Sequence, residues 1–279
     1  LFKSFAKINL ALNVTGKLTK LHKIESIVKF VDLHDLISIK RINRNKHNIL
    51  FSGNFSKNIS RNNTVKTLFD ILDGEKLLDN KKFQIKIKKN IPQKAGLGGG
   101  SMNASTLIKF IIKNYRISIN KKKLSKISSN IGSDVILGLE AKNILLKNLK
   151  KTISTKKKLN LYMLLVKPNI NCSTQTIYSK SKSFSKSYRI KGNNINKLFE
   201  IKNLKNDLND LEKVTFKIYP KVKDLCNFIK KQKQCEFSRM TGSGSVCVGY
   251  FRSLKFAKKA RQSIRYYFPN YWSRISKAI

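Results

Sequence analysis

The chain has 279 residues, and 59 lysines and arginines against 15 aspartates and glutamates give it a formal net charge of +44. The apolar fraction of 41% is enough to bury a core, which excludes a wholly disordered chain. The longest apolar run, residues 161–166, is far shorter than the roughly 20 residues that span a bilayer. The first residues lack a signal-peptide core, so we expect a soluble, cytoplasmic protein of one large or two modest domains.

Hydrophobic periodicity predicts strands in the first third of the chain. Residues 26–40 indicate two short strands separated by a turn at 32–35, where Asp, Leu, His and Asp follow one another. The alternation of apolar and polar residues over 83–88 is typical of a half-buried strand. Apolar residues then recur at helical spacing, so we expect a helix that begins near Ser101.

The remainder of the chain continues the mixture of strands and helices. The apolar run from Leu161 predicts a buried strand, and helices are expected from about Pro220 and over residues 254–268. Interleaved strands and helices indicate an α+β protein. The polar stretch 147–160 is the best boundary between two halves, and the polar stretch 179–196 is expected to be a mobile insertion.

The cysteines indicate neither a zinc site nor a disulfide framework. The four cysteines form no CxxC pair, and the three histidines lie far from them in sequence. Cys226 and Cys247 stand among apolar residues and are expected to act as small core residues.

The net charge raises nucleic-acid binding as a possible function, because Lys and Arg neutralise phosphates. Lysine, however, is spread along the whole chain and is accompanied by abundant Asn and Ile, a joint bias expected of an AT-rich coding sequence. We therefore interpret most of the charge as compositional drift on solvated faces and expect neither a specific nucleic-acid partner nor a membrane partner. The positive field would still attract anionic small molecules.

Residues 92–104, here called the glycine-rich loop, are the most informative segment. The loop follows a predicted strand and opens a predicted helix, and four of the five residues 96–100 are glycine. Glycines allow close approach to an anion, which the N–H groups and the dipole of a helix start would attract. The Gly-Lys-Ser/Thr ending of a Walker A loop is missing. Phosphate binding is favoured over a plain flexible turn.

A second glycine segment, residues 240–245, precedes another apolar run. Taken alone it is a weak signal, because a tight turn before a strand explains it as well as ligand contact does.

Together with residues 4–10, these two segments stand in the order of the three motifs of the GHMP small-molecule kinases, which the chain resembles over nearly its full length. Residues 14–17, His22, 30–35 and 131–135 further resemble the members that phosphorylate the 2-hydroxyl of 4-diphosphocytidyl-2-C-methyl-D-erythritol in the non-mevalonate isoprenoid pathway. The resemblance implies an α+β, two-domain GHMP kinase fold. Its N-terminal half, residues 1–152, would be ribosomal-protein-S5-domain-2-like and its C-terminal half, residues 153–279, ferredoxin-like, with ATP and substrate in the cleft between them.

The resemblance also implies a catalytic pair. Asp134 would accept the proton of the substrate hydroxyl, while Lys7 would orient Asp134 and stabilise the developing alkoxide. Without the family pattern, a helix cap is the better interpretation of Asp134, and Lys7 is better interpreted as one solvated lysine among many.

The binding residues implied by the resemblance fall into two groups. ATP, accompanied by Mg²⁺, would be bound by Asn63 and by Pro92, Gln93, Lys94, Ala95, Gly96, Leu97, Gly98, Gly99, Gly100, Ser101 and Met102. Ser101 could also offer its hydroxyl to Mg²⁺. The substrate would contact Asn9, His22 and Tyr178, with Tyr178 stacked on the cytosine ring. The residue before His22 is Leu21, where the family has an aromatic residue.

Three other interpretations stay open at this point. A GHMP kinase for another small alcohol, such as homoserine or a mevalonate-type substrate, would not need His22 and Tyr178. A basic RNA-binding protein could use the same N-terminal fold, because fold alone does not fix function. A degenerate kinase could keep the fold without the activity, although both implied catalytic residues are present.

Overall fold

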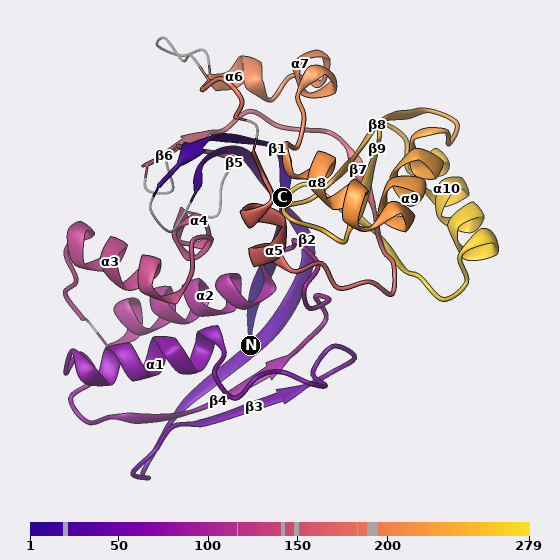
Figure 1. Ribbon diagram of the computed structural model, residues 1–279. Helices are drawn as coiled ribbons and strands as arrows, with labels where there is room; N and C mark the ends of the chain where they lie inside the picture. Colours follow the sequence, from indigo (N-terminus) through magenta and orange to yellow (C-terminus); the bar gives the residue numbers. More distant parts are fainter. Residues whose placement is uncertain (19–21, 116, 141–142, 148–150, 183, 189–194) are drawn as a thin grey trace. The chain divides into compact units, whose positions relative to one another are not determined.

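The computed structural model describes residues 1–18, 22–115, 117–140, 143–147, 151–182, 184–188 and 195–279 (Figure 1). The chain forms two compact units, each assembled from three pieces of sequence. The first unit comprises Leu1–Ala6, Leu33–Gln93 and Gly98–Ala141, and the second comprises Lys7–Asp32, Lys94–Leu97 and Lys142–Ile279. Two long strands, β1 (Phe2–Lys17) and β2 (His22–Ile42), therefore contribute residues to both units.

In the first unit, helices pack beside a small sheet. The end of β2 pairs antiparallel with β4 (Lys82–Lys88), which pairs in parallel with β3 (Asn48–Ser52). The helices are α1 (Thr64–Gly74), α2 (Gly99–Asn114), α3 (Lys121–Ile131) and α4 (Val135–Glu140), with α1 and α2 side by side (Figure 1). The helical spacing noted in the sequence places one face of α2 in the core, through Ala104, Leu107, Ile108 and Ile111.

The expectation of two short strands over residues 26–40 is wrong, because β2 is one continuous strand of 21 residues. Asp35 does not start a turn. Its buried carboxylate accepts hydrogen bonds from Lys89 Nζ and from the backbone N–H groups of Asn90 and Ile91, at 2.7 and 2.9 Å for the two backbone bonds. Because the carboxylate finds these partners in the segment directly after β4, it does not bond its own backbone in a turn.

The second unit contains two groups of paired strands. The start of β2 pairs antiparallel with β5 (Asn143–Lys147), and β5 pairs antiparallel with β6 (Lys151–Thr155). A four-stranded antiparallel sheet has the order β10 (Trp272–Lys277), β7 (Tyr162–Lys167), β9 (Cys247–Phe251) and β8 (Cys235–Met240). Helices α9 (Pro220–Lys230) and α10 (Leu254–Tyr267) pack on this sheet. The shorter helices are α5 (Thr174–Ser179), α6 (Ile195–Leu198), α7 (Ile201–Asn206) and α8 (Leu211–Ile218).

Most of the other predicted elements are confirmed. β4 and β7 match the expected strands, and α2, α9 and α10 match the expected helices to within two residues. Cys226 and Cys247 are buried as expected. Within the described ranges, no helix has both the length and the apolar character needed to cross a membrane.

The two polar stretches are more ordered than expected wherever they are described. β6 lies within residues 147–160, of which 148–150 are outside the described residues. In the stretch 179–196, residues 183 and 189–194 are outside the described residues. Elsewhere in that stretch, Ser187 Oγ and Tyr188 N donate hydrogen bonds to the buried Glu25 carboxylate at 2.6 and 2.7 Å. The part of the stretch around Ser187 is therefore tethered rather than mobile.

Candidate active site

The backbone of the glycine-rich loop adopts the left-handed conformation at three residues. Lys94, Gly96 and Gly98 have φ values of 48°, 72° and 69°. Gly98 is the N-cap of α2, and no side chain among the described residues caps this helix. The first-turn N–H groups of α2 are therefore directed out of the helix start, where an anion would meet them and the positive end of the helix dipole.

The first unit brings two other functional segments to the start of α2. A Cβ added to Gly100 would lie 3.0 Å from Thr64 Oγ1, so the start of α1 is adjacent. A Cβ added to Gly132 would lie 3.4 Å from Ser101 Oγ, so the turn between α3 and α4 is also adjacent. That turn carries the half-buried Asp134. The first unit thus places the implied base in the segment next to the implied phosphate-binding helix.

A buried ion pair supports the start of α2. Asp35 is fully buried and pairs with Lys89, which is 4% exposed, and Asn103 Nδ2 on α2 donates to Asp35 Oδ2 at 3.1 Å. A Cβ added to Gly99 would lie 3.4 Å from Lys89 Nζ. Sequence reasoning missed this network because it assigned Asp35 to a turn. The signal available was that apolar residues continue on both sides of Asp35 without a glycine or proline to break the strand.

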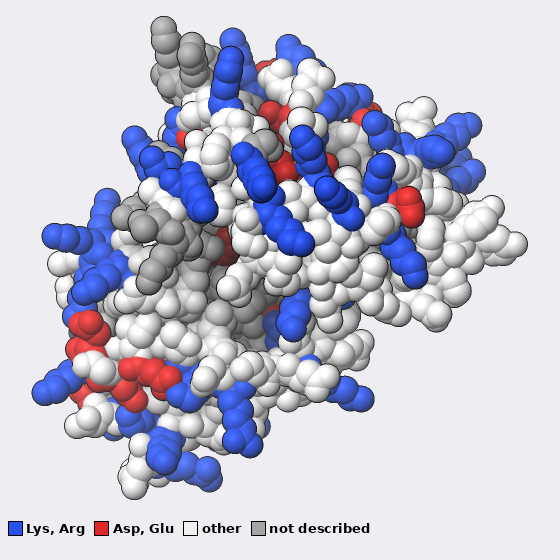
Figure 2. Space-filling model, in the orientation of Figure 1, with Lys and Arg blue, Asp and Glu red and all other residues white. Residues whose placement is uncertain are grey.

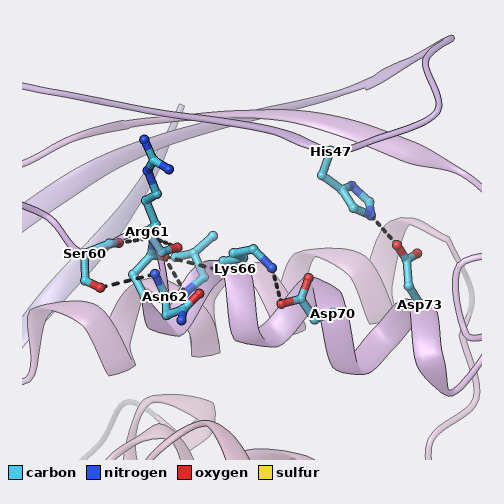
Figure 3. A network of polar contacts seen from close by, with 9 residues as sticks. His47, Ser60, Arg61, Asn62, Lys66, Asp70 and Asp73 are labelled. Carbon is cyan, nitrogen blue, oxygen red and sulfur yellow. Dashed lines mark hydrogen bonds and ion pairs between the residues drawn. The ribbon is translucent and has the colours of Figure 1, made fainter.

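Asn63 acts as a helix cap. Its Oδ1 accepts hydrogen bonds from Val65 N and Lys66 N, both at 3.1 Å, and its Nδ2 donates to the carbonyl oxygen of Ser60 at 3.0 Å. Asn63 also lines a cavity of about 560 Å³ along α1. Figure 3 shows the polar side chains of this region, where Lys66 pairs with Asp70 at 2.5 Å and Arg61 points away from the helix. In the structure Asn63 is thus the N-cap of α1, and its contact with ATP stays a prediction.

In the second unit, the three motifs converge on Asn9. Lys7 is 3% exposed, and its Nζ donates to Asn9 Oδ1 at 2.6 Å. Asn9 N donates to Thr241 Oγ1 at 2.9 Å, and Thr241 Oγ1 donates to Gly96 O at 3.2 Å. Lys7 N also donates to Leu97 O at 3.1 Å. These bonds join the first strand, the glycine-rich loop and the second glycine segment around the implied catalytic lysine.

The second glycine segment is more than a plain turn. A Cβ on Gly96 would lie 2.0 Å from Thr241 O, so the two segments approach each other as closely as backbones allow. Asn209 Nδ2 donates to Met240 O and Gly242 O, both at 2.8 Å. Sequence reasoning missed the roles of Thr241 and Asn209, because their partners are remote in sequence.

The residues expected at the cytosine end are also neighbours in the second unit. The rings of His22, at the start of β2, and Tyr178, on α5, have centroids 5.3 Å apart and are inclined by 38°. Burial, and to a smaller extent the charge of Lys17, lower the pKa of His22 below its usual 6.5. His22 is therefore neutral at pH 7 and can both donate and accept a hydrogen bond. Leu21 lies outside the described residues.

The remaining expected ATP-binding residues have defined local settings. Gln93 Nε2 donates to the carbonyl oxygens of Phe55 and Lys57 at 2.7 and 2.8 Å, which ties the loop to the segment after β3. Met102, in the first turn of α2, has a buried side chain.

Of the two implied catalytic residues, Asp134 belongs to the first unit and Lys7 to the second.

Comparisons with known proteins agree with this geometry. Residues 63–141 match the GHMP kinases N terminal domain, and residues 190–270 match the GHMP kinases C terminal domain. The chain is 50% identical over 277 residues to the 4-diphosphocytidyl-2-C-methyl-D-erythritol kinase of Pelagibacter ubique (strain HTCC1062), covering 99% of this chain and 98% of the relative. It is 32% identical to the protein of the same name from Wolbachia pipientis wMel, covering 97% and 95%.

Solved structures show the same two-domain fold. A crystal structure of 4-(cytidine 5'-diphospho)-2C-methyl-D-erythritol kinase matches with a TM-score of 0.76 at 19% identity, over 99% of this chain and 98% of that one. Homoserine kinase from Cytophaga hutchinsonii matches with a TM-score of 0.70 at 15% identity, over 99% and 96%. The expected α+β fold is thereby confirmed, and the chain belongs to the GHMP kinase family.

Proposed function

We propose that this protein is an ATP-dependent kinase that phosphorylates the 2-hydroxyl of 4-diphosphocytidyl-2-C-methyl-D-erythritol. The observation that carries the proposal is the 50% identity to a kinase of that name along almost the whole of both chains. The adjacent rings of His22 and Tyr178 support it, because a neutral imidazole and a phenol ring are suited to reading and stacking a base. A cytoplasmic location stays a prediction.

In the proposed reaction, Asp134 accepts the proton of the 2-hydroxyl as the hydroxyl oxygen bonds to the γ-phosphorus of ATP. The bond between that phosphorus and the β–γ bridging oxygen breaks, and ADP leaves with the bonding electrons. An aspartate suits this role because phosphoryl transfer asks the protein mainly to position the hydroxyl and to stabilise charge.

Lys7 supplies positive charge to the alkoxide that develops during transfer. Its ammonium is held by Asn9 at 2.6 Å, and Asn9 is itself fixed by Ser26 Oγ, to which its Nδ2 donates at 2.7 Å. All three side chains are buried, so the position of the ammonium is set before substrate binds. Asn9 is thus proposed to position Lys7 as well as to contact the substrate.

The start of α2 is proposed to bind the phosphates of ATP. GHMP kinases use ATP as their co-substrate, and the uncapped first turn of α2 offers several N–H groups to one anion. Asn63 would shape the neighbouring turn at the start of α1, which lies against Gly100.

The residues present also fit Mg²⁺. No group of three or more His, Cys, Asp or Glu side chains within the described ranges could hold a metal ion alone. Ser101 Oγ lies 3.4 Å from a Cβ added to Gly132, in the turn that also carries Asp134, and hydroxyl and carboxylate oxygens suit a Mg²⁺ whose other ligands are phosphate oxygens and water. Mg²⁺ bound there would neutralise charge on the phosphates.

Two alternatives remain testable. The homoserine kinase similarity concerns the fold alone, so another small alcohol is the first alternative. RNA binding through the net charge is the second, and it would not require Lys7, Asp134 and an uncapped helix start together.

The proposal is tested by ADP release with a panel of alcohols. We expect turnover with ATP and 4-diphosphocytidyl-2-C-methyl-D-erythritol, and none above background with homoserine or mevalonate. ATP binding with turnover of another alcohol alone would favour the first alternative. Salt-sensitive RNA binding without ATP affinity would favour the second.

The lowered pKa of His22 predicts how substrate binding depends on pH. Because burial keeps this imidazole neutral to below pH 6.5, the KM for the cytidine substrate should stay constant from pH 8 to 6.5 and rise only under more acidic conditions. The measurement is KM against pH at saturating ATP. In His22→Asn, which cannot titrate in this range, KM should be higher at every pH and the acidic rise should disappear. An unchanged acidic rise in that variant would contradict the assignment.

A further inference from the structure

The second unit contains a strongly cationic cavity of about 700 Å³ that the proposed reaction does not use. It lies where α10 packs beside the edge strand β10. Lys258, Arg261 and Arg265 of α10 line the cavity, and their spacing of i, i+3 and i+7 places them on one face of the helix. The cationic side chains that line it are Lys258, Arg261, Arg265, Arg274 and Lys277, and the acidic one is Asp32.

The arginines distinguish this cavity from the rest of the basic surface. Figure 2 shows lysine and arginine side chains scattered over the visible face of the protein, as compositional drift predicts. Drift in this chain produces lysine, since only ten of its 59 basic residues are arginine. Three of those ten line this one cavity. Arginine is the residue whose planar fork matches two phosphate oxygens at once.

The cavity holds five cationic side chains and one carboxylate, that of Asp32. Among the described residues, none of the five forms an ion pair, and Asp32 Oδ1 accepts a hydrogen bond from the backbone N–H of Lys277 at 3.2 Å. The pKa of Arg261 is lowered by its burial and then by the like charges of Arg265 and Arg274. An anion in the cavity would relieve this repulsion.

Two serines of β10, Ser273 and Ser276, line the cavity. Arg261 donates to Ser273 O at 3.0 Å and to Ser273 Oγ at 3.4 Å, which fixes the direction of its guanidinium. Ser276 is 1% exposed and lines the cavity, and its hydroxyl has no hydrogen-bond partner among the residues that the structure describes. Six buried hydroxyls of the described residues lack a hydrogen-bond partner, and Ser276 is the one of these six that lines the cavity, where a bound anion would supply an acceptor.

We propose that this cavity binds a small, multiply phosphorylated anion at a site separate from the glycine-rich loop. Arg261, Arg265 and Arg274 would bind the phosphate oxygens, and Ser276 would donate its hydroxyl to one of them. The volume lies in the range of about 300–1,000 Å³ typical of small-molecule sites. Nucleic acid fits less well, because it tracks along an open basic surface and not into one concave pocket.

Inorganic tripolyphosphate is the probe, titrated calorimetrically into the full chain at constant ionic strength with a non-hydrolysable ATP analogue saturating the nucleotide site. We expect one further binding event. Arg265→Gln/Arg274→Gln should weaken it at least about tenfold, because charge-assisted hydrogen bonds are lost. Both arginines are exposed, so the fold should survive the change. The control Lys255→Gln/Lys259→Gln removes the same charge from exposed positions of α10 outside the cavity lining and should change affinity by less than about twofold.

The variant Ser276→Ala tests whether the Ser276 hydroxyl binds the anion or only contributes to the stability of the fold. Removing an unpaired buried hydroxyl should leave thermal stability equal or higher, while weakening tripolyphosphate binding several-fold. The proposal is overturned if both double variants lose affinity equally, if Ser276→Ala binds as the wild type does, or if no second event is seen. Displacement of tripolyphosphate by single-stranded RNA but not by pyrophosphate or a nucleoside triphosphate would assign the surface to nucleic acid instead.

Discussion

Asp134→Asn should reduce turnover of ATP and 4-diphosphocytidyl-2-C-methyl-D-erythritol by about 10²–10⁴-fold, the range that general bases contribute. The amide has the shape of the carboxylate but cannot accept the proton of the 2-hydroxyl. The measurement is kcat from steady-state ADP release at saturating concentrations of both substrates.

The same variant must remain folded and able to bind ATP for this loss to report on the base. Asp134 is half-buried at a turn outside the main core cluster, and Asn is equally compatible with that turn, so the unfolding temperature and ATP affinity should stay near those of the wild type. A kcat within about threefold of wild type would exclude Asp134 as the base, because a difference that small is below any general-base contribution.

Asp35→Asn should lower the free energy of unfolding by about 3–5 kcal/mol, the cost of breaking a buried ion pair from one side. The change leaves the Lys89 ammonium buried without its counter-charge and weakens the acceptor for Asn90 N and Ile91 N. Urea unfolding followed by circular dichroism measures the loss. Phosphate binding should weaken as well, since Asn103 ties this pair to α2.

Asp79→Asn is the matched control for Asp35→Asn. Asp79 is paired with Lys81 at 2.7 Å, but its side chain is 80% exposed, so breaking this pair should change stability little. The double variant Asp35→Asn/Lys89→Met should recover part of the lost stability, because no charge is then left buried. Equal effects of Asp35→Asn and Asp79→Asn would contradict the role given to the buried pair.

The sequence predicted those features that depend on neighbours along the chain. The alternation in β4 and the helical spacing in α2 are local, and so is the turn chemistry of Gly96 and Gly98, whose φ values are positive as the loop requires. The three kinase motifs could be found because each is a short continuous segment and their order is visible in the sequence. The roles of Lys7 and Asp134 came from the resemblance, and they stay proposals.

Features that depend on distant partners could not be predicted in this way. Asp is typical of turns, so Asp35 alone suggests a turn. In the structure it lies in β2, where its carboxylate pairs with Lys89, 54 residues later in the sequence. Thr241 was part of a weak turn signal, and its bond to Asn9 crosses 232 residues. The net charge could not locate the cationic cavity beside α10. It is a sum over the whole chain, and it does not show that three arginines line one cavity.

The interleaving of the two units limits how the protein can be divided. A fragment ending at residue 141 would contain every piece of the first unit, but it would also carry residues 7–32 without β5. The segment Glu25–Val28 would then present unpaired backbone and the apolar side chains of Ile27 and Val28 at a free sheet edge, which is a template for aggregation. Domain-by-domain expression is thus a poor route to either unit. Proteolytic nicking within the described loops, with both pieces retained, is the better way to probe their independence.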